Sequence, residues 1–309
     1  MKEKLIVVVG PTAVGKTKVS VELANRLGGE IINGDSMQVY KGMDIGTAKI
    51  TEEETKGVPH HLFNIKQPID SYSAAEFQDL ARPLVTAINE RGKIPIVVGG
   101  TGMYIKALTH HFNFTDTASD RVYREKMEKF AEEHGNEKLH ERLKDIDPES
   151  AAGIHPNNVR RVIRALEVFH ATGIPASERK EKERESPYLL APIGLTMERE
   201  KLYERINQRV DEMIKEGLIE EVRGLYESGI GECQSIQAIG YKEIYAYLRG
   251  DCSMEEAVSQ LKQNSRRYAK KQYTWFLRQM DIRWFDVTDG DFEKKISSIL
   301  RFVQERFRQ

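Results

Sequence analysis

The amino-acid sequence predicts an α/β protein with a doubly wound parallel sheet that is interrupted by a helical insertion. Short apolar, β-branched runs alternate with helical patterns at both ends of the chain. Such alternation is typical of a parallel sheet with helices on both faces, and not of a sandwich or a bundle. From about residue 115 to residue 187 only charged amphipathic helices are indicated. We therefore expect a discontinuous core domain, residues 1–114 plus 188–309, and a helical insertion, residues 115–187.

Five segments carry the strand pattern of this core. They are residues 5–9, 30–33, 94–98, 193–197 and 282–287. After the first segment, Val19, Leu23 and Leu27 recur at helical spacing, which predicts a helix that begins near Lys16. The highly charged run of residues 178–185 precedes the fourth strand and is predicted to be a mobile loop.

Composition narrows the class of protein. The 309 residues are 39% hydrophobic and 31% charged, and no apolar run approaches the ~20 residues of a membrane span, so no membrane role is expected. The first strand begins within a few residues of the N-terminus, which leaves no room for a signal peptide and predicts a cytoplasmic protein. Cys233 and Cys252 lack the spacing of a zinc site or a disulfide framework and are expected to be packing residues. A net charge of −1 argues against indiscriminate nucleic-acid binding, although it is compatible with local basic patches.

A phosphate-binding loop follows the first strand directly. Residues 10–17 read GPTAVGKT, a complete GxxxxGK[ST] motif, in which glycines expose backbone N–H groups to anionic oxygens and the next helix points its positive end at the anion. Lys16 adds a positive charge, and the hydroxyl of Thr17 is expected to bind Mg²⁺. We expect the whole loop to contact a phosphate ester: Gly10, Pro11, Thr12, Ala13, Val14, Gly15, Lys16 and Thr17. The motif does not identify that ester, and the alternative is a glycine-rich turn that binds nothing.

Two further strands end in polar residues. The second is followed by Asp35, Ser36 and Gln38, and the third by two glycines and Thr101. Because the carboxyl ends of parallel strands meet at one edge of a sheet, we expect these residues and the phosphate loop to converge on one crevice. An ATPase or GTPase normally carries a Mg²⁺-binding aspartate after such a strand, and its absence from the third strand favours Asp35 as a general base. The alternatives are a turn or N-cap aspartate and a tight glycine turn.

Two helical segments carry basic clusters. In the first, Asn157 is available as the N-cap, and one face of the helix is apolar: Val159, Val162, Ile163, Leu166 and Phe169. Arg160, Arg161 and Arg164 lie on the opposite face, where the pattern alone favours a solvated surface over phosphate contacts. The second segment, residues 264–276, interleaves four basic residues with aromatics. That pattern is typical either of a polynucleotide-binding surface or of a last helix packed on the sheet.

Several separate blocks together resemble the tRNA dimethylallyltransferase family, which prenylates adenosine 37 beside the anticodon. The blocks are GPTAVGKT, GDSMQVYKGMDIGTAKI (residues 34–50), PHHLFNI (59–65), YSAAEF (72–77), VGGTGMYIKAL, HPNNVRRVIRALEVF, AIGYKEI (238–244) and RRYAKKQYTWF. They span nearly the entire chain, and the block 34–50 is far more diagnostic than the phosphate loop. The resemblance implies a P-loop-type core whose helical insertion grips the anticodon stem-loop of tRNA.

The resemblance also implies a reaction and its residues. Dimethylallyl diphosphate, bound with Mg²⁺, gives its prenyl group to N6 of adenosine 37, and N6-dimethylallyladenosine and diphosphate are formed. Asp35 matches the family's general base, Thr101 a threonine close to that base, and Arg205 an arginine near the donor phosphates. The tRNA contacts implied are Asp35, Ser36, Met37, Gln38, Thr101, Arg124, Val159, Arg160, Arg161, Val162 and Ile163. Asn158 stands where the family pattern has an aspartate, which leaves that polar contact open, and the C-terminal zinc finger of some relatives is missing.

The resemblance therefore favours a prenyltransferase acting on tRNA, and the self-contained fold favours a monomer. One alternative is an ATP-dependent small-molecule kinase, because its phosphate loop and Mg²⁺-binding hydroxyl look alike. Another is a non-catalytic RNA-binding protein with a vestigial nucleotide site. The kinase would consume ATP with a small acceptor, whereas the binding protein would turn over nothing.

Overall fold

The computed structural model describes residues 2–110, 120–178, 185–231 and 233–308. The chain divides into two compact units. The first comprises residues 1–111 and 185–309, and the second comprises residues 112–184. The predicted core domain and insertion, residues 1–114 plus 188–309 and residues 115–187, follow nearly the same division.

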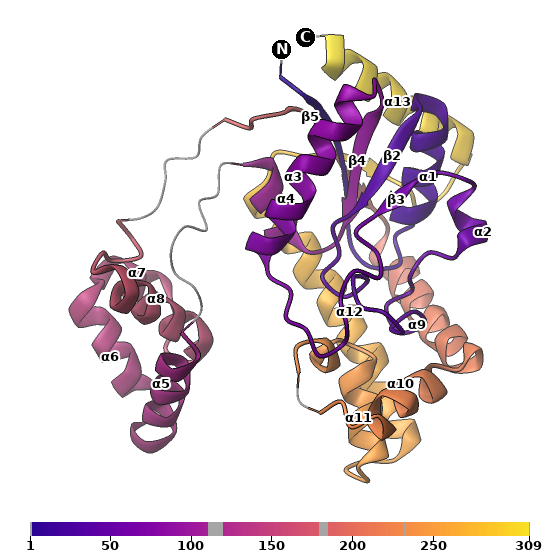
Figure 1. The fold of residues 1–309 in the computed structure, drawn as a ribbon. Coiled ribbons are helices and arrows are strands. Elements are labelled where there is room, and N and C mark those ends of the chain that lie inside the picture. The colour runs from indigo at the N-terminus through magenta and orange to yellow at the C-terminus, as the bar shows by residue number, and fades with distance from the viewer. Residues whose placement is uncertain (1, 111–119, 179–184, 232, 309) are drawn as a thin grey trace. The chain divides into compact units, whose positions relative to one another are not determined.

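The first unit is built on a parallel sheet of six strands (Figure 1). The strands are β1 (Lys4–Val9), β2 (Gly29–Asn33), β3 (His60–His61), β4 (Ile94–Gly99), β5 (Leu189–Thr196) and β6 (Arg283–Asp286). Their order across the sheet is β3-β2-β4-β1-β5-β6. The parallel sheet and five of its strands are as predicted, whereas β3 was missed because two histidines carry no apolar pattern.

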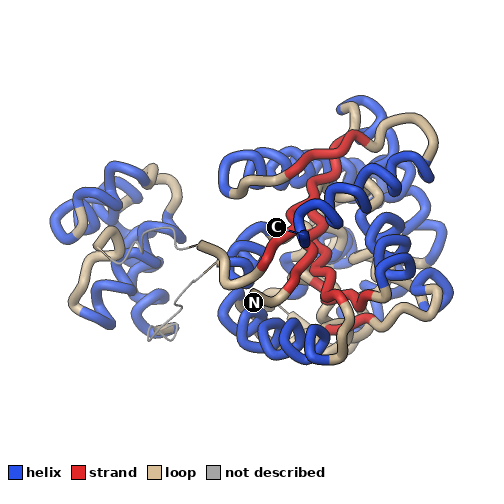
Figure 2. The backbone as a smooth tube through the Cα atoms, turned by 90° about the horizontal axis from the view of Figure 1, so that it is seen from above, coloured by secondary structure: helices blue, strands red, loops and turns tan. Residues whose placement is uncertain are grey.

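Helices cover both faces of this sheet, which confirms the doubly wound architecture (Figure 2). Side chains of β1 alternate between two hydrophobic clusters, with Leu5 in one and Ile6 in the other. The cluster that contains Leu5 is closed by α3 (Ala74–Glu90) and α4 (Gly102–Thr109). The opposite cluster is closed by α1 (Lys16–Leu27) and α13 (Phe292–Arg308).

Four further helices lie at the carboxyl end of the sheet (Figure 1). They are α9 (Arg199–Glu216), α10 (Leu218–Glu227), α11 (Tyr241–Leu248) and α12 (Met254–Gln279). A short helix, α2 (Glu52–Thr55), and a 3₁₀ turn at Ser235–Gln237 complete the first unit's described helices. The basic and aromatic segment 264–276 lies in α12, so the expectation that it forms the last helix was wrong because α13 follows it.

The second unit, within its described residues 120–178, consists of helices alone, as predicted. They are α5 (Arg121–His134), α6 (Asn136–Ile146), α7 (Pro148–Gly153) and α8 (Val159–Thr172), and they share a small apolar core. The N-cap of α8 is Asn158 and not Asn157, and its side chain makes no capping hydrogen bond. The predicted loop 178–185 falls almost wholly on residues 179–184, which lie outside the described residues.

Cys233 and Cys252 are free and partly buried against the main core, which agrees with their predicted packing role. The Sγ of Cys233 lies 3.3 Å from the carbonyl oxygen of Pro68. Among the helices of the described residues, none has the length and apolarity needed to cross a membrane.

Candidate active site

The phosphate-binding loop lies where the connections of two neighbouring strands leave toward opposite faces of the sheet. The chain continues from β1 into α1 on one face and from the adjacent β4 into α4 on the other. Ligands of open α/β sheets bind at such a switch point, beyond the carboxyl ends of the strands. The topology therefore brings the ends of β1, β2 and β4 to one crevice, as the sequence predicted.

The geometry of the loop suits an anion. Gly15 precedes α1 with φ near 100°, a conformation that side chains rarely adopt, and no side chain caps the helix. The first N–H groups of α1 are thus open to a ligand at the positive end of the helix. The Nζ of Lys16 donates to the carbonyl oxygens of Gly10 (3.0 Å) and Pro11 (2.8 Å), which holds the ammonium group beside the loop.

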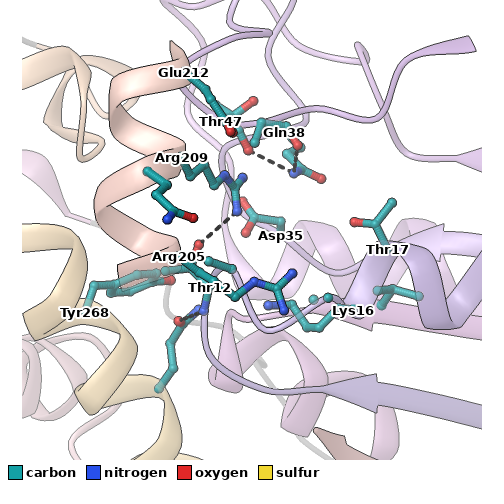
Figure 3. Close-up of a pocket in the computed structure, with 17 residues that line it drawn as sticks. Thr12, Lys16, Thr17, Asp35, Gln38, Thr47, Arg205, Arg209, Glu212 and Tyr268 are labelled. Carbon is teal, nitrogen blue, oxygen red and sulfur yellow. Dashed lines mark hydrogen bonds between the residues drawn. The ribbon is translucent and has the colours of Figure 1, made fainter. Parts of the chain in front are cut away.

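A pocket with a volume of ≈ 380 Å³ opens beside this loop, and its walls come from all three strand ends and from α9 and α12 (Figure 3). The predicted residues that line it are Thr12, Ala13, Gly15, Lys16, Thr17, Asp35, Gln38 and Arg205. Gly10, Pro11, Val14, Ser36, Met37 and Thr101 do not line it but belong to the segments that form its walls. Residues that were not predicted also line it, among them Thr47, Arg209, Tyr268 and Gln272.

Asp35 lies in a hydrogen-bonded turn and also faces the pocket. Its Oδ1 accepts from the N–H of Met37 at 2.8 Å, and its own N–H donates to Oδ1 of Asn33 at 3.0 Å. The Oγ1 of Thr101 accepts from the N–H of Ser36 at 3.2 Å, which ties the end of β4 to this turn. Asp35 is therefore both a turn residue and a pocket residue. Its Oδ1 accepts the hydrogen bond of the turn, whereas its Oδ2 takes no part in the turn.

Arg209 is the basic residue that sequence reasoning missed. It lies one turn after Arg205 on α9, and its Nη1 donates to Oγ1 of Thr12 in the phosphate loop at 3.3 Å (Figure 3). Neither arginine forms an ion pair within the described residues, although the charges of Asp35 and Glu212 act on Arg209 from a greater distance. In RINQR, Arg205 and Arg209 are four residues apart and therefore lie on the same face of the helix. This spacing could have predicted Arg209 once Arg205 was recognised.

Electrostatics of the pocket favour an anionic ligand. Loss of contact with water lowers the pKa of Lys16 to about 8; the nearby Asp35 opposes this shift and Arg209 adds to it. Desolvation likewise lowers the pKa of Arg209, and Asp35 is again the main opposing charge. A partly buried ammonium beside an unpaired guanidinium gains stability from a polyanion that neutralises both.

Helix α12 connects the phosphate loop to the end of β4 through Gln272. Its Oε1 accepts from the N–H of Thr12 at 2.8 Å, and its Nε2 donates to the carbonyl oxygen of Gly100 at 3.1 Å. One turn earlier, Tyr268 lines the pocket. Lys270 and Lys271 on the same helix are exposed. Polar and aromatic side chains of this segment thus build part of the pocket wall, and its interpretation as a polynucleotide-binding surface stays a prediction.

The predicted residues of the insertion lie in the second unit. Arg124 binds Glu167 through Nε and Nη2, both at 2.8 Å, and Glu167 is fully buried. The side chains of Val162 and Ile163 are buried in the helical core, and the predicted tRNA contact at these two positions stays a prediction. Val159 is partly buried, whereas Arg160 and Arg161 are exposed and remain the predicted RNA contacts of α8.

Comparisons with known proteins agree with one another over the whole chain. A family model described as IPP transferase matches residues 38–279. The chain is 59% identical to a tRNA dimethylallyltransferase of Halalkalibacterium halodurans, over 100% of this chain and 99% of that protein. It is 60% identical to a protein of the same name from Anoxybacillus flavithermus, over 99% and 98% of the two chains.

Solved structures give the same result. The full-length tRNA isopentenylpyrophosphate transferase from Bacillus halodurans is similar with a TM-score of 0.76 and 57% identity, over 99% of both chains. A eukaryotic dimethylallyltransferase acting on tRNA is similar with a TM-score of 0.84 and 32% identity, over 99% of this chain and 79% of that one. The similarity thus extends beyond the phosphate loop to both units.

Proposed function

Because this chain belongs to the IPP transferase family, we propose that it acts as a tRNA dimethylallyltransferase. The group transferred is the dimethylallyl group of dimethylallyl diphosphate, and the acceptor is N6 of adenosine 37 in the anticodon loop. The observation that carries this proposal is that the phosphate loop and the carboxylate of Asp35 line the same pocket. Neither the family match nor the relatives support the kinase interpretation.

Asp35 is the general base of the proposed reaction. The exocyclic N6 amine is a weak nucleophile, since its lone pair is delocalised into the adenine ring. As N6 forms a bond to C1 of the donor, the C1–O bond breaks and its electron pair leaves with diphosphate, while Asp35 takes a proton from N6. The free oxygen of this carboxylate is the atom suited to that step, because Oδ1 already accepts from Met37.

The leaving diphosphate needs positive charge around it. Lys16, Arg205 and Arg209 provide three cations, and the N–H groups at the start of α1 provide donors. Thr17 supplies a hydroxyl at the same pocket, which suits Mg²⁺ because that ion takes few protein ligands and completes its shell with phosphate oxygens and water. Bound there, Mg²⁺ would neutralise charge on the diphosphate.

The acceptor adenine must leave its stack to reach this pocket, as for other enzymes that act on bases. Ser36, Met37 and Gln38 follow Asp35 directly and are proposed to contact the extruded nucleotide; of the three, Gln38 lines the pocket. Exposed Arg160 and Arg161 on α8 are proposed to bind backbone phosphates of the anticodon arm. With a net charge of only −1, recognition rests on a single-stranded loop and on such local contacts.

One experiment separates this function from its alternatives. The protein is incubated with labelled dimethylallyl diphosphate, Mg²⁺ and unmodified tRNA that carries A36 and A37, and label in the tRNA is counted. We expect label at A37 and none in a tRNA whose position 37 is not adenosine. Absence of label from the first tRNA would refute the proposal, and ATP consumption with a small acceptor would point to the kinase.

Replacing Arg209 by glutamine is expected to weaken donor binding. The variant removes a guanidinium that no carboxylate of the described residues pairs with, so we expect the Kd for dimethylallyl diphosphate to rise about 10-fold or more. Isothermal titration of the donor measures this. Lys215→Gln, which removes an exposed charge from the same helix, is the matched control and should leave the Kd unchanged. An equal response of the two variants would contradict a specific role.

Reversing the charge of Arg160 or Arg161 to glutamate is expected to weaken tRNA binding. Each phosphate contact that is lost should reduce the slope of log K against log salt by about 0.7 to 0.9. Filter binding at several salt concentrations measures the slope. Lys126→Glu, an exposed reversal on α5, is the control. Slopes equal to that of the control would contradict the phosphate contacts and show that both arginines are only solvated surface residues.

A further inference from the structure

Residues 44–48, here called the 44–48 loop, contribute to a wall of the pocket and are bound by α10, which lies far away in the sequence. Thr47 and Ala48 line the pocket beside Asp35 and Gln38. The carbonyl oxygens of Thr47 and Ala48 accept from Nε2 of Gln38, at 3.0 and 3.2 Å (Figure 3). Since its amide N–H₂ is used on the loop, Gln38 has its Oε1 left for a ligand. The position of the loop therefore sets the orientation of Gln38.

One carboxylate on α10 holds this loop. Oε2 of Glu221 accepts from the N–H groups of Asp44 and Ile45, both at 2.8 Å, and Oε1 accepts from the N–H of Gly46 at 3.0 Å. Three consecutive backbone donors on one ionised group form charge-assisted bonds, which are stronger than bonds between neutral groups. The 44–48 loop has little regular structure of its own, so this carboxylate takes the place of a backbone ladder.

Tyr241, the first residue of α11, completes the arrangement. Its hydroxyl donates to Oε1 of Glu221 at 2.5 Å, and its side chain is fully buried. Burial, followed by the charge of Glu221, raises the pKa of Tyr241, so the hydroxyl stays protonated and remains a donor. A Cβ at Gly46 would lie 2.5 Å from Cε2 of the tyrosine ring, so only glycine allows the loop to pack this closely on it.

We propose that Glu221 and Tyr241 are positioning residues for the acceptor side of the transfer reaction. Neither residue lines the pocket. They fix the 44–48 loop, the loop orients Gln38, and Gln38 lies three residues after the base Asp35. This inference rests on the proposed function, because the acceptor is identified through it.

The donor side is held by different contacts. The phosphate loop, which includes Lys16, is bound through Thr12 by Gln272 and Arg209, and within the described residues none of these side chains forms a hydrogen bond to Glu221 or to the 44–48 loop. A displaced 44–48 loop should thus disturb how the adenine is presented while leaving the diphosphate site intact. A loss confined to the acceptor side would therefore distinguish a positioning role of Glu221 and Tyr241 from a general role in stabilising the fold.

The test compares Glu221→Gln with Glu220→Gln, its exposed neighbour on α10, whose side chain forms no hydrogen bond or ion pair within the described residues. A glutamine at position 221 keeps the shape but loses the charge, and its N–H₂ meets groups that are themselves donors. We expect kcat/KM for tRNA to fall about 10- to 100-fold, with the Kd for dimethylallyl diphosphate within about 2-fold of the parent protein. Tyr241→Phe keeps the ring against Gly46, removes one bond, and should give a smaller loss of the same kind.

The outcomes separate cleanly. A tRNA-side loss with donor affinity retained supports the inference, whereas kinetics equal to those of Glu220→Gln, or equal losses on both sides, overturn it. If Glu221→Gln does not fold, Tyr241→Phe decides by the same criteria. Transfer by the parent protein and by Glu220→Gln is measured in the same series. A failure of the proposed function would appear there, independently of the ratio between variants.

Discussion

Replacing Asp35 by asparagine is expected to lower the transfer rate about 10²- to 10⁴-fold, the usual contribution of a general base. Asparagine retains an oxygen that accepts from the N–H of Met37, so the turn after β2 is preserved. The variant also removes a negative charge that faces Lys16 and Arg209. Donor affinity should therefore stay unchanged or increase slightly, because the anionic diphosphate no longer meets a carboxylate of like charge.

The measurement is a single-turnover rate at saturating donor and tRNA, together with an independent Kd for the donor. A fall in rate without a fall in donor affinity assigns Asp35 to the acceptor. If both fell in proportion, Asp35 would belong to the metal or to the structure of the pocket. Asp79→Asn, an exposed change on α3 in the same unit, controls for the loss of one carboxylate.

The sheet was predictable because buried parallel strands appear in the sequence as apolar, β-branched runs. β1 has five consecutive residues with no solvent exposure, a run that no other strand or helix of the described residues has. β3 has only His60 and His61, and its two residues pair with Ile31 and Ile32 of β2. Its existence depends on a tertiary contact with a strand and not on local pattern, so no periodicity reveals it.

The site was predictable only where chemistry lies in a local motif. The phosphate loop and Asp35 stand in short segments after strands, where topology alone brings them together. Arg209 and Gln272 are single polar residues on amphipathic helices. Each belongs to the site because the fold brings it within hydrogen-bond distance of Thr12. In α8 the helical period correctly predicted that Val162 lies in the core, whereas the RNA contact implied by the resemblance has no local pattern that would predict it.

Replacing Lys16 by methionine is expected to lower kcat/KM for dimethylallyl diphosphate about 10²- to 10³-fold, since it removes a positive charge from the leaving group. The Kd for tRNA in the absence of donor should not change, because Lys16 bonds only to carbonyls of its own loop in the described structure. Steady-state kinetics in donor, with tRNA binding measured separately, test this. A variant with unchanged donor kinetics would show that the loop binds its ligand without this side chain.

The pH dependence of donor binding supplies an independent check on the same residue. Lys16 binds an anion in its protonated form, and its pKa in the free protein is about 8. Donor affinity should thus be fully present below about pH 8 and fall about tenfold for each further unit, whereas Lys16→Met should show no such decline. Asp35 opposes the lowering of this pKa and Arg209 adds to it. Asp35→Asn should therefore shift the decline to lower pH and Arg209→Gln to higher pH, and shifts in the reverse order would contradict this account of the pocket's charges.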